Sequence, residues 1–304
     1  MTPSTDAALA VWEAARRIDR TMSSAEYHAH PALGSTGARV IVNECPAMLQ
    51  APPPEPKTAF DIGNATHLLV LQPEDFQART GIIDAFDYRK PETRTARDDI
   101  RLDGRIPLLR DEYEAVVAMR DAILRDPIAG VAFKDGIAEQ SMFWTDPATG
   151  VECKVRPDWV PSSGAYLIDV KTSASANPDD FQGTIGRYGY HQQAAWYLDG
   201  VKAVLGIPAQ RFAFVVVQKT PPHLVSVCWL DDEAIEWGRI LNRYARGVFA
   251  WCKEHDTWPG YVPAIGQPPR AFTVGLPAWS LKNLQARHEA GAFEPPIVER
   301  ELAA

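Results

Sequence analysis

The sequence predicts a β-sheet wrapped by helices, an α/β or α+β fold. Three runs rich in apolar and β-branched residues predict consecutive strands: "AEQSMFWTD" (138–146), "VECKVRPDWV" (151–160) and "AYLIDVKT" (165–172). The connectors between them, "PATG" and "PSSG", consist of turn-forming residues, which favours an antiparallel meander. Longer segments with helical periodicity lie before and after these strands. This mixture predicts a central mixed sheet flanked by helices.

The segments outside the meander follow from periodicity and from capping residues. In "STGARVIVNECP" (35–46), Ser35 or Thr36 can cap a helix, and Pro46 lies beyond its end. We expect the other helices at 5–20, 59–72, 110–127, 178–187, 190–202, 231–254 and 278–288. Further strands are expected at 76–84, 211–219 and 223–230, whereas the polar stretch 88–110 is expected to be irregular.

Composition narrows the classes of function. Hydrophobic residues make up 46% of the 304 residues and charged residues 23%, as in ordinary globular proteins. No apolar run reaches the ~18 to 20 residues of a membrane span, and the first residues lack the apolar core of a signal peptide, so we expect a cytoplasmic protein. The net charge of −8 gives no global attraction to nucleic acid. The four cysteines show no close pair, which argues against a zinc ribbon or an iron–sulfur cluster: Cys45, Cys153, Cys228 and Cys252.

Two charged residues interrupt the apolar strand "LIDVKT". Alternation places Asp169 and Lys171 on the same face, and burying either charge is costly unless it is paired or coordinated. A simple ion pair would satisfy both. The alternative is a metal site, because Asp158 on the preceding strand can meet Asp169 across the hairpin, and two adjacent carboxylates repel unless a cation lies between them. Lys171 would then face the ion and its attacking water.

These residues resemble a known family. "RPDWV", "LIDVKT" and "YHQQAAWYLDG", together with "GNATHLLVL" and "WPGY", resemble the PD-(D/E)XK nuclease superfamily, and more narrowly the RecE-type exonucleases of bacteriophage and prophage recombination. The resemblance extends over about residues 22–261. It implies a restriction-endonuclease-like core, preceded by an N-terminal helical extension (1–21) and followed by a loop-rich tail (262–304).

The resemblance also implies roles for individual residues. His67 of the GxxxH element, Asp158 and Asp169 would bind the metal, with the carbonyl of Val170 as a further ligand. Lys171 would serve the attacking water and the transition state. The remaining matches are Gln193 and Tyr197 of the QxxxY element, which would help to hold the lysine and the DNA backbone, and Glu139, a candidate for a second metal or for a role near the metal.

The stretch 88–110 is a candidate DNA contact. It contains seven basic and four acidic residues, so it is locally cationic in an acidic chain. Clusters of arginine and lysine bind phosphate backbones by releasing counterions. We therefore expect Arg94, Arg97 and Arg101 to contact DNA, although a solvated loop of mixed charge would have the same composition.

Taken with the resemblance, the sequence predicts a metal-dependent deoxyribonuclease. The expected activity is 5′→3′ degradation of linear double-stranded DNA with Mg²⁺, for which Mn²⁺ would substitute. It would leave 3′ overhangs for a single-strand annealing protein of RecT type, and the enzyme would form a homo-oligomeric ring, a trimer or tetramer. The alternatives are an endonuclease or single-strand nuclease on the same fold, or a catalytically idle DNA-binding or scaffold protein.

Overall fold

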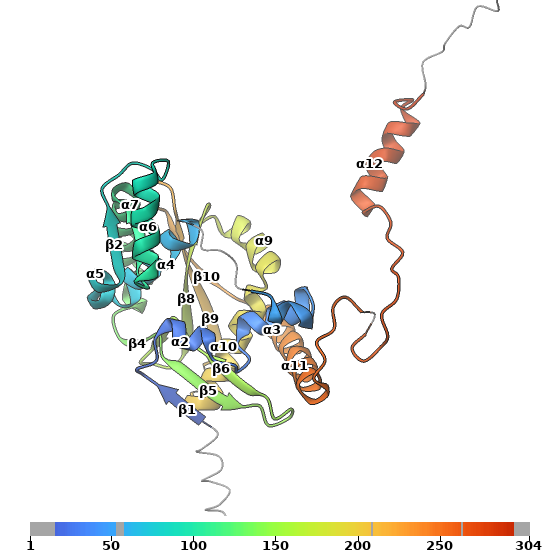
Figure 1. The fold of residues 1–304 in the computed structure, drawn as a ribbon, viewed down its shortest axis with the longest axis horizontal. Coiled ribbons are helices and arrows are strands. Elements are labelled where there is room, and N and C mark those ends of the chain that lie inside the picture. Colours follow the sequence, from blue (N-terminus) through green and yellow to red (C-terminus); the bar gives the residue numbers. More distant parts are fainter. Residues whose placement is uncertain (1–15, 53–57, 208, 263, 295–304) are drawn as a thin grey trace, which may run out of the picture. The chain divides into compact units, whose positions relative to one another are not determined.

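The computed structural model describes residues 16–52, 58–207, 209–262 and 264–294. The chain divides into two compact units, one ending at Gly260 and the other beginning at Tyr261. All of the described strands belong to the first unit (Figure 1). The described part of the second unit contains one helix, α12 (Ala278–Glu289), which has no buried residue.

The first unit is built around a mixed sheet of five strands in the order β10-β9-β8-β7-β4. β8 and β9 run parallel, whereas the neighbouring pairs are antiparallel. β9 is buried on both faces along "FAFVVV", as expected for the interior strand of a covered sheet. The bounds are Gly136–Ala138 (β4), Trp159–Pro161 (β7), Tyr166–Ser173 (β8), Arg211–Gln218 (β9) and Val225–Trp229 (β10).

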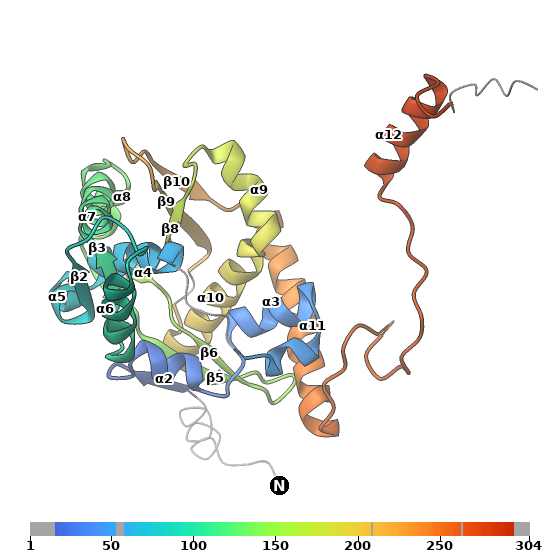
Figure 2. The ribbon, with the colours of Figure 1, turned by 45° about the horizontal axis from the view of Figure 1, so that its top comes forward.

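Helices cover both faces of this sheet (Figures 1 and 2). On one face, α4 (Thr58–Leu71), α7 (Arg110–Arg125) and α8 (Ala129–Ala132) share an apolar core with Ile168, Val170, Val215 and Val217 of β8 and β9. On the other face lie α9 (Pro178–Tyr188) and α10 (Tyr190–Leu205), with the long helix α11 (Asp232–His255) against α10. The ring of Phe181 in α9, for example, contacts Phe214 of β9.

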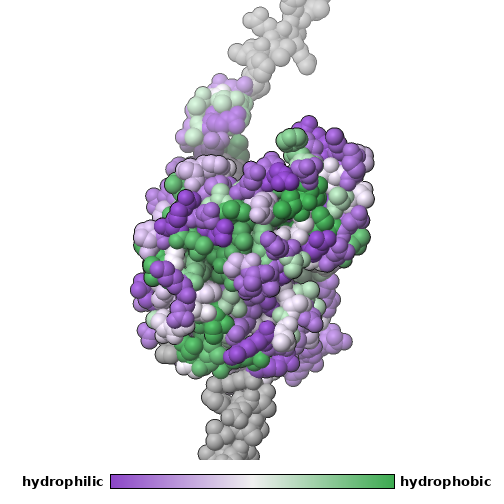
Figure 3. All heavy atoms as spheres, turned by 90° about the vertical axis from the view of Figure 1, so that its left-hand side faces the viewer, coloured by the Kyte–Doolittle hydropathy of each residue, from purple (hydrophilic) through white to green (hydrophobic). Residues whose placement is uncertain are grey.

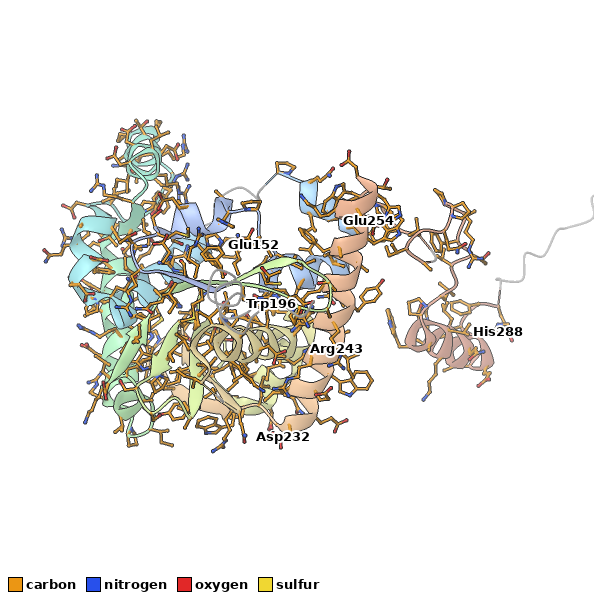
Figure 4. The ribbon with its side chains drawn as sticks, turned by 90° about the horizontal axis from the view of Figure 1, so that it is seen from below. Glu152, Trp196, Asp232, Arg243, Glu254 and His288 are labelled. Atoms are coloured by element: carbon orange, nitrogen blue, oxygen red, sulfur yellow. The ribbon has the colours of Figure 1, made fainter. Side chains whose placement is uncertain are left out.

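A second, three-stranded sheet has the order β1-β5-β6. Its strands are Arg16–Asp19 (β1), Ser141–Thr145 (β5) and Glu152–Val155 (β6), and all are antiparallel. Trp196 of α10, labelled in Figure 4, joins helix and sheet: its ring packs against Trp144, and its Nε1 donates a hydrogen bond to the carbonyl of Lys154 at 2.9 Å. The expected meander is therefore split between two sheets, because the chain passes from β6 into β7 at Pro157.

The remaining elements form a small parallel pair and short helices. β2 (Thr80–Ile83) pairs with β3 (Ile106–Leu109), and α6 (Pro91–Leu102) connects them. The shorter helices are α2 (Ser24–Ala29), α3 (Ser35–Asn43), α5 (Phe76–Arg79) and the 3₁₀ turns η1 (Pro46–Gln50) and η2 (Pro73–Asp75).

Four expectations from the sequence need correction. The stretch 88–110 is not irregular, because it contains α6 and β3. Residues 16–19 form a strand rather than the end of a helix, since they pair with β5, while residues 1–15 lie outside the described part of the chain. The first half of 76–84 is helical. Gly34, rather than Ser35 or Thr36, is the N-cap of α3.

Other features agree with the sequence. The long helices at 59–72, 110–127, 190–202 and 231–254 are confirmed within a few residues. On the side of the molecule that lies at the left of Figure 1, apolar residues gather in separate patches among hydrophilic ones (Figure 3). Among the described residues, no helix combines the length and apolar character that crossing a bilayer requires.

Candidate active site

Asp158 lies where two strands of the central sheet separate. β7 and β8 pair at Trp159 and Ile168. Beside this pair the side chain of Asp158 replaces a backbone partner, since its Oδ2 accepts the amide N–H of Val170 at 2.8 Å. Pro157 precedes Asp158 and has no N–H to continue the β6 ladder. The fork between β7 and β8 thus holds a carboxylate that is only 6% exposed.

Asp169 lies one residue before Val170 and is fully buried. Its Oδ2 forms an ion pair with Nζ of Lys171, the next residue on the same face of β8. Its Oδ1 accepts a hydrogen bond of 2.6 Å from Nε2 of Gln193, in the first turn of α10. The two charges that interrupt the strand are therefore paired with each other, and the side-chain amide of Gln193 fixes the carboxylate of Asp169.

His67 reaches the same fork from α4. Its Nε2 lies 2.5 Å from Oδ2 of Asp158, and its Nδ1 lies 3.3 Å from Oε1 of Glu139. Gly63, one turn earlier, allows α4 to lie close to β8: a Cβ at this position would stand 3.3 Å from Oγ1 of Thr172, closer than most such contacts. The GxxxH spacing thus places the imidazole against the strands.

Glu139 follows β4 and is held by Arg156. The Nε of Arg156 lies 2.6 Å from Oε2 of Glu139, and a second guanidinium nitrogen donates to Oγ of Ser141 at 2.9 Å. The backbone of Glu139 has a positive φ of 54°, an uncommon conformation for a residue with a side chain. Its N–H is directed at the carbonyls of Pro157 and Asp158, which explains how this conformation is maintained. Glu139 is thereby fixed beside Asp158.

His67, Glu139 and Asp158 could together hold a divalent metal ion. Each offers one ligand atom, and these atoms all lie within 4.8 Å of one another. Carboxylate oxygens suit Mg²⁺ and Mn²⁺, and an imidazole nitrogen is a common ligand of transition metals. This triad includes Glu139 and omits Asp169, whose oxygens contact Gln193 and Lys171. The amide of Val170 donates to Asp158, and the role of its carbonyl as a metal ligand stays a prediction.

The carboxylates strongly perturb the ionisation of their neighbours. Burial lowers the pKa of His67, but Asp158, Glu139 and Asp169 outweigh it and raise that pKa to about 9. Burial, reinforced by Asp158, raises the pKa of Asp169 to about 6. Burial also raises the pKa of Glu139. In the metal-free protein, a protonated His67 pairs with Asp158, as Lys171 pairs with Asp169 and Arg156 with Glu139.

Lys171 is a cation at neutral pH. Burial opposes its charge, but Asp169 and Asp158 outweigh burial and raise the pKa of Lys171 above its ordinary value. Its side chain keeps 21% of its surface exposed, so the ammonium remains accessible. Lys171 is therefore suited to stabilising negative charge, and poorly suited to accepting a proton from water.

We expect the metal-free protein to lose stability as the pH rises from about 6.5 to about 9, because folding raises the pKa of His67. A raised pKa means that the folded state favours the protonated ring. This contribution is complete below the unfolded pKa and is lost as the pH passes the folded one, and it amounts to at most about 3 kcal/mol. Denaturant unfolding in EDTA at pH 6 and 9.5 should show a smaller difference for His67→Gln than for wild type. His288→Gln, an exposed control, should match wild type, and an identical pH difference in all three proteins would contradict this assignment.

The QxxxY element is arranged differently from the expectation. Gln193 contacts Asp169 rather than Lys171. The ring of Tyr197 packs against Phe212 of β9, and burial raises the pKa of its hydroxyl far above the usual value. Two aromatic rings lie near Nζ of Lys171: the ring centroid of Tyr190 is 4.9 Å away and that of Phe214 is 5.8 Å away.

Two residues of the site had no role in the sequence analysis. Arg156 shares a strand face with Asp158 in the alternating pattern, and this spacing could have identified it as a neighbour. Tyr190 precedes Gln193 by three positions, so both lie on one face of α10.

The predicted DNA-contacting arginines lie on α6, and two of them have acidic partners. Arg101 forms an ion pair of 2.6 Å with the buried Asp61 of α4. Arg97 pairs with its neighbour Asp98 at 2.8 Å. Arg94 is exposed and donates to the carbonyl of Arg89. Arg101 thus joins two helices, and Arg94 and Arg97 remain the better candidates for contacting a phosphate backbone.

Comparisons with known proteins support the fold and the superfamily. The family model described as "PDDEXK-like domain of unknown function (DUF3799)" matches residues 42–265. A crystal structure of a protein from Eubacterium rectale, described as a "putative exonuclease", aligns with a TM-score of 0.57 and 14% sequence identity, over 86% of this chain and 98% of that chain. At this identity the alignment shows a shared fold. A search of curated proteins gave no match. The predicted fold class and the resemblance to the PD-(D/E)XK superfamily are confirmed, and the chain belongs to the DUF3799 family of PDDEXK-like domains.

Proposed function

We propose that the protein is a metal-dependent DNA nuclease, and more narrowly a Mg²⁺-dependent 5′→3′ exonuclease of the RecE type. One observation carries the proposal: Asp158, Asp169 and Lys171 on adjacent strands meet His67 of α4 in one cluster, in which the two aspartates are buried. The protein of similar fold from Eubacterium rectale, which is described as a "putative exonuclease", supports the proposal of action at strand ends.

Different residues of the site would bind the metal and stabilise the phosphate during phosphodiester hydrolysis. His67, Asp158 and Glu139 would hold the metal, with Asp169 beside them, and Arg156 keeps Glu139 in place. A bound divalent cation lowers the pKa of its water and neutralises phosphate charge. Nζ of Lys171 donates to the negative oxygens that develop when water adds to phosphorus and the P–O bond to the leaving group breaks. No covalent intermediate is required.

Release of the label from end-labelled DNA tests the polarity. A linear duplex labelled at its 5′ ends should release the label at once in Mg²⁺. A label at the 3′ ends should instead stay on the DNA, in a 3′ single-stranded overhang that grows as the opposite strand is degraded. Earlier release of the 3′ label would contradict the polarity. Equal cleavage of single-stranded and double-stranded DNA would favour the single-strand nuclease, and internal cuts would favour the endonuclease. Binding of DNA without any cleavage would favour the idle scaffold.

Replacing Arg94 and Arg97 together by alanine should weaken DNA binding for all sequences and flatten its salt dependence. The slope of log affinity against log salt is about −0.9 for each duplex phosphate neutralised, so the loss of two contacts should reduce its magnitude by about 2. Arg101 stays in place, because its removal would leave the buried Asp61 without its partner. Arg243→Ala, an exposed arginine of α11 (Figure 4), serves as the control. An unchanged slope in the double variant would mean that α6 does not contact DNA.

We further propose that the enzyme works as a homo-oligomeric ring, a trimer or tetramer, and transfers its 3′ overhang to an annealing protein of RecT type. A chain with a net charge of −8 is repelled by duplex phosphates outside its local contacts, and a ring keeps the strand enclosed through many cycles. Light scattering should show an oligomer, and covalently closed circular DNA should resist degradation. A monomer at micromolar concentration that cuts closed circles would contradict the ring.

A further inference from the structure

A pair of stacked tyrosines lies at the corner between α9 and α10. The rings of Tyr188 and Tyr190 have centroids 5.7 Å apart and an interplanar angle of 28°. Tyr188 is 54% exposed, whereas Tyr190 is partly buried against Phe181 and Phe214. The pair therefore presents one aromatic ring to solvent on top of another that is anchored in the core.

The backbone fixes this corner. Gly189 joins the two helices with a positive φ of 64°, a conformation that favours glycine. A Cβ at this position would stand 3.1 Å from Cδ of Arg39 in α3. The guanidinium of the same arginine donates to the carbonyl of Tyr188 at 2.9 Å. The backbone that carries both tyrosines is consequently held in position by α3.

The corner is continuous with the candidate active site. The ring of Tyr190 lies against the ammonium of Lys171, at 4.9 Å from Nζ to the centroid. Gln193, one turn into α10, holds Asp169. The first turn of α10 thus faces the site, and the positive end of a helix dipole favours phosphate. This corner thus brings together the Tyr188–Tyr190 stack, the first turn of α10 and the ammonium of Lys171.

We propose that Tyr188 and Tyr190 form a stacking site for an unpaired nucleobase of the DNA strand whose phosphate lies at Lys171. Nucleobases stack on aromatic side chains without sequence preference, but a base inside a duplex has both faces covered by its neighbours. The site therefore takes the frayed end of one strand of a duplex, where the terminal base is unpaired. This inference rests on the proposed nuclease function and specifies the form in which DNA reaches the catalytic group.

A fluorescent base analogue tests the stacking directly. An oligonucleotide with 2-aminopurine near its 5′ end should lose fluorescence on binding wild-type protein in Ca²⁺, with the absence of cleavage checked on a denaturing gel. Tyr188→Ala should restore the fluorescence of the bound oligonucleotide and weaken binding by about 10- to 100-fold. Tyr188→Phe keeps the ring and should behave as wild type. Tyr244→Ala, on α11, removes another tyrosine that is 54% exposed and should change neither quantity.

The outcomes separate this site from the nuclease itself. Quenching of the wild-type extent in Tyr188→Ala would overturn the stacking site. An equal loss of quenching and affinity in Tyr188→Ala and Tyr244→Ala would overturn it as well. If wild-type protein binds the oligonucleotide without quenching 2-aminopurine, the stacking site is also overturned. Mg²⁺-dependent cleavage by the same preparation would then still support the nuclease assignment. A wild-type protein that neither binds nor cleaves DNA would overturn both. Thermal unfolding verifies that each variant is folded.

Discussion

Replacing Asp158 by asparagine should reduce Mg²⁺-dependent DNA cleavage by at least about 10³-fold, equivalent to about 4 kcal/mol of transition-state stabilisation. Asp158 is the acid that both sides of the site share: its Oδ2 accepts the amide of Val170 and contacts His67. Asparagine preserves an oxygen for the Val170 amide, so the strand fork should remain, while the negative charge is lost. The variant should therefore stay folded and bind Mn²⁺ more weakly.

The control for this substitution is Asp199→Asn on α10, where the carboxylate is partly exposed and pairs with Arg239. It should retain wild-type cleavage and metal affinity. Single-turnover cleavage of a labelled duplex and calorimetric titration with Mn²⁺ provide the two readouts. Wild-type turnover in Asp158→Asn would remove Asp158 from the site.

Replacing Lys171 by methionine should also abolish most activity, by about 10²- to 10³-fold, but for a different reason. Methionine preserves the apolar stem of the side chain against Tyr190 and Phe214 and removes the ammonium. The phosphate would lose a charged donor, whereas the acids would lose a competing cation. Metal affinity should accordingly stay the same or rise, in contrast to Asp158→Asn.

Lys171→Arg distinguishes charge from geometry. If positive charge is what matters, arginine should recover part of the lost rate, and the pH–rate profile of wild type should show no step from lysine deprotonation near neutral pH, because the pKa of Lys171 is raised. Weakened metal binding in Lys171→Met would mean that the lysine supports the metal site instead. Unaltered turnover would exclude Lys171 from the reaction.

The fold could be predicted where side-chain pattern and local structure coincide. α4, α7, α10 and α11 contain many apolar residues, and their predicted limits agree with the structure within a few residues. α6 is amphipathic but contains few apolar residues: Thr93 is its buried residue, and charged side chains dominate the rest. β1 and β3 are four residues long and exist because they pair with strands far away in the sequence. Tertiary pairing of this kind leaves no periodic signal.

In the candidate site, too, some neighbours could be predicted from sequence pattern, whereas others depend on the tertiary structure. Asp158, Asp169 and Lys171 could be placed together because strand alternation and a hairpin determine their neighbours. Glu139 was expected near the metal, but its contact with His67 depends on a left-handed backbone conformation that sequence pattern does not predict. Arg156 follows β6 and Tyr190 begins α10. Strand spacing places Arg156 beside Asp158, but its contact with Glu139 and the contact of Tyr190 with Lys171 depend on the assembled fold.

Cleavage of linear duplex DNA by the purified protein, with Mg²⁺ or with EDTA and alongside Asp158→Asn, tests the central claim most directly. Mononucleotides or shortened strands should accumulate with wild type in Mg²⁺, and neither EDTA-treated wild type nor Asp158→Asn should produce them. Intact DNA after prolonged incubation of folded wild-type protein with Mg²⁺ or Mn²⁺ would contradict the claim that this group of residues is a nuclease site.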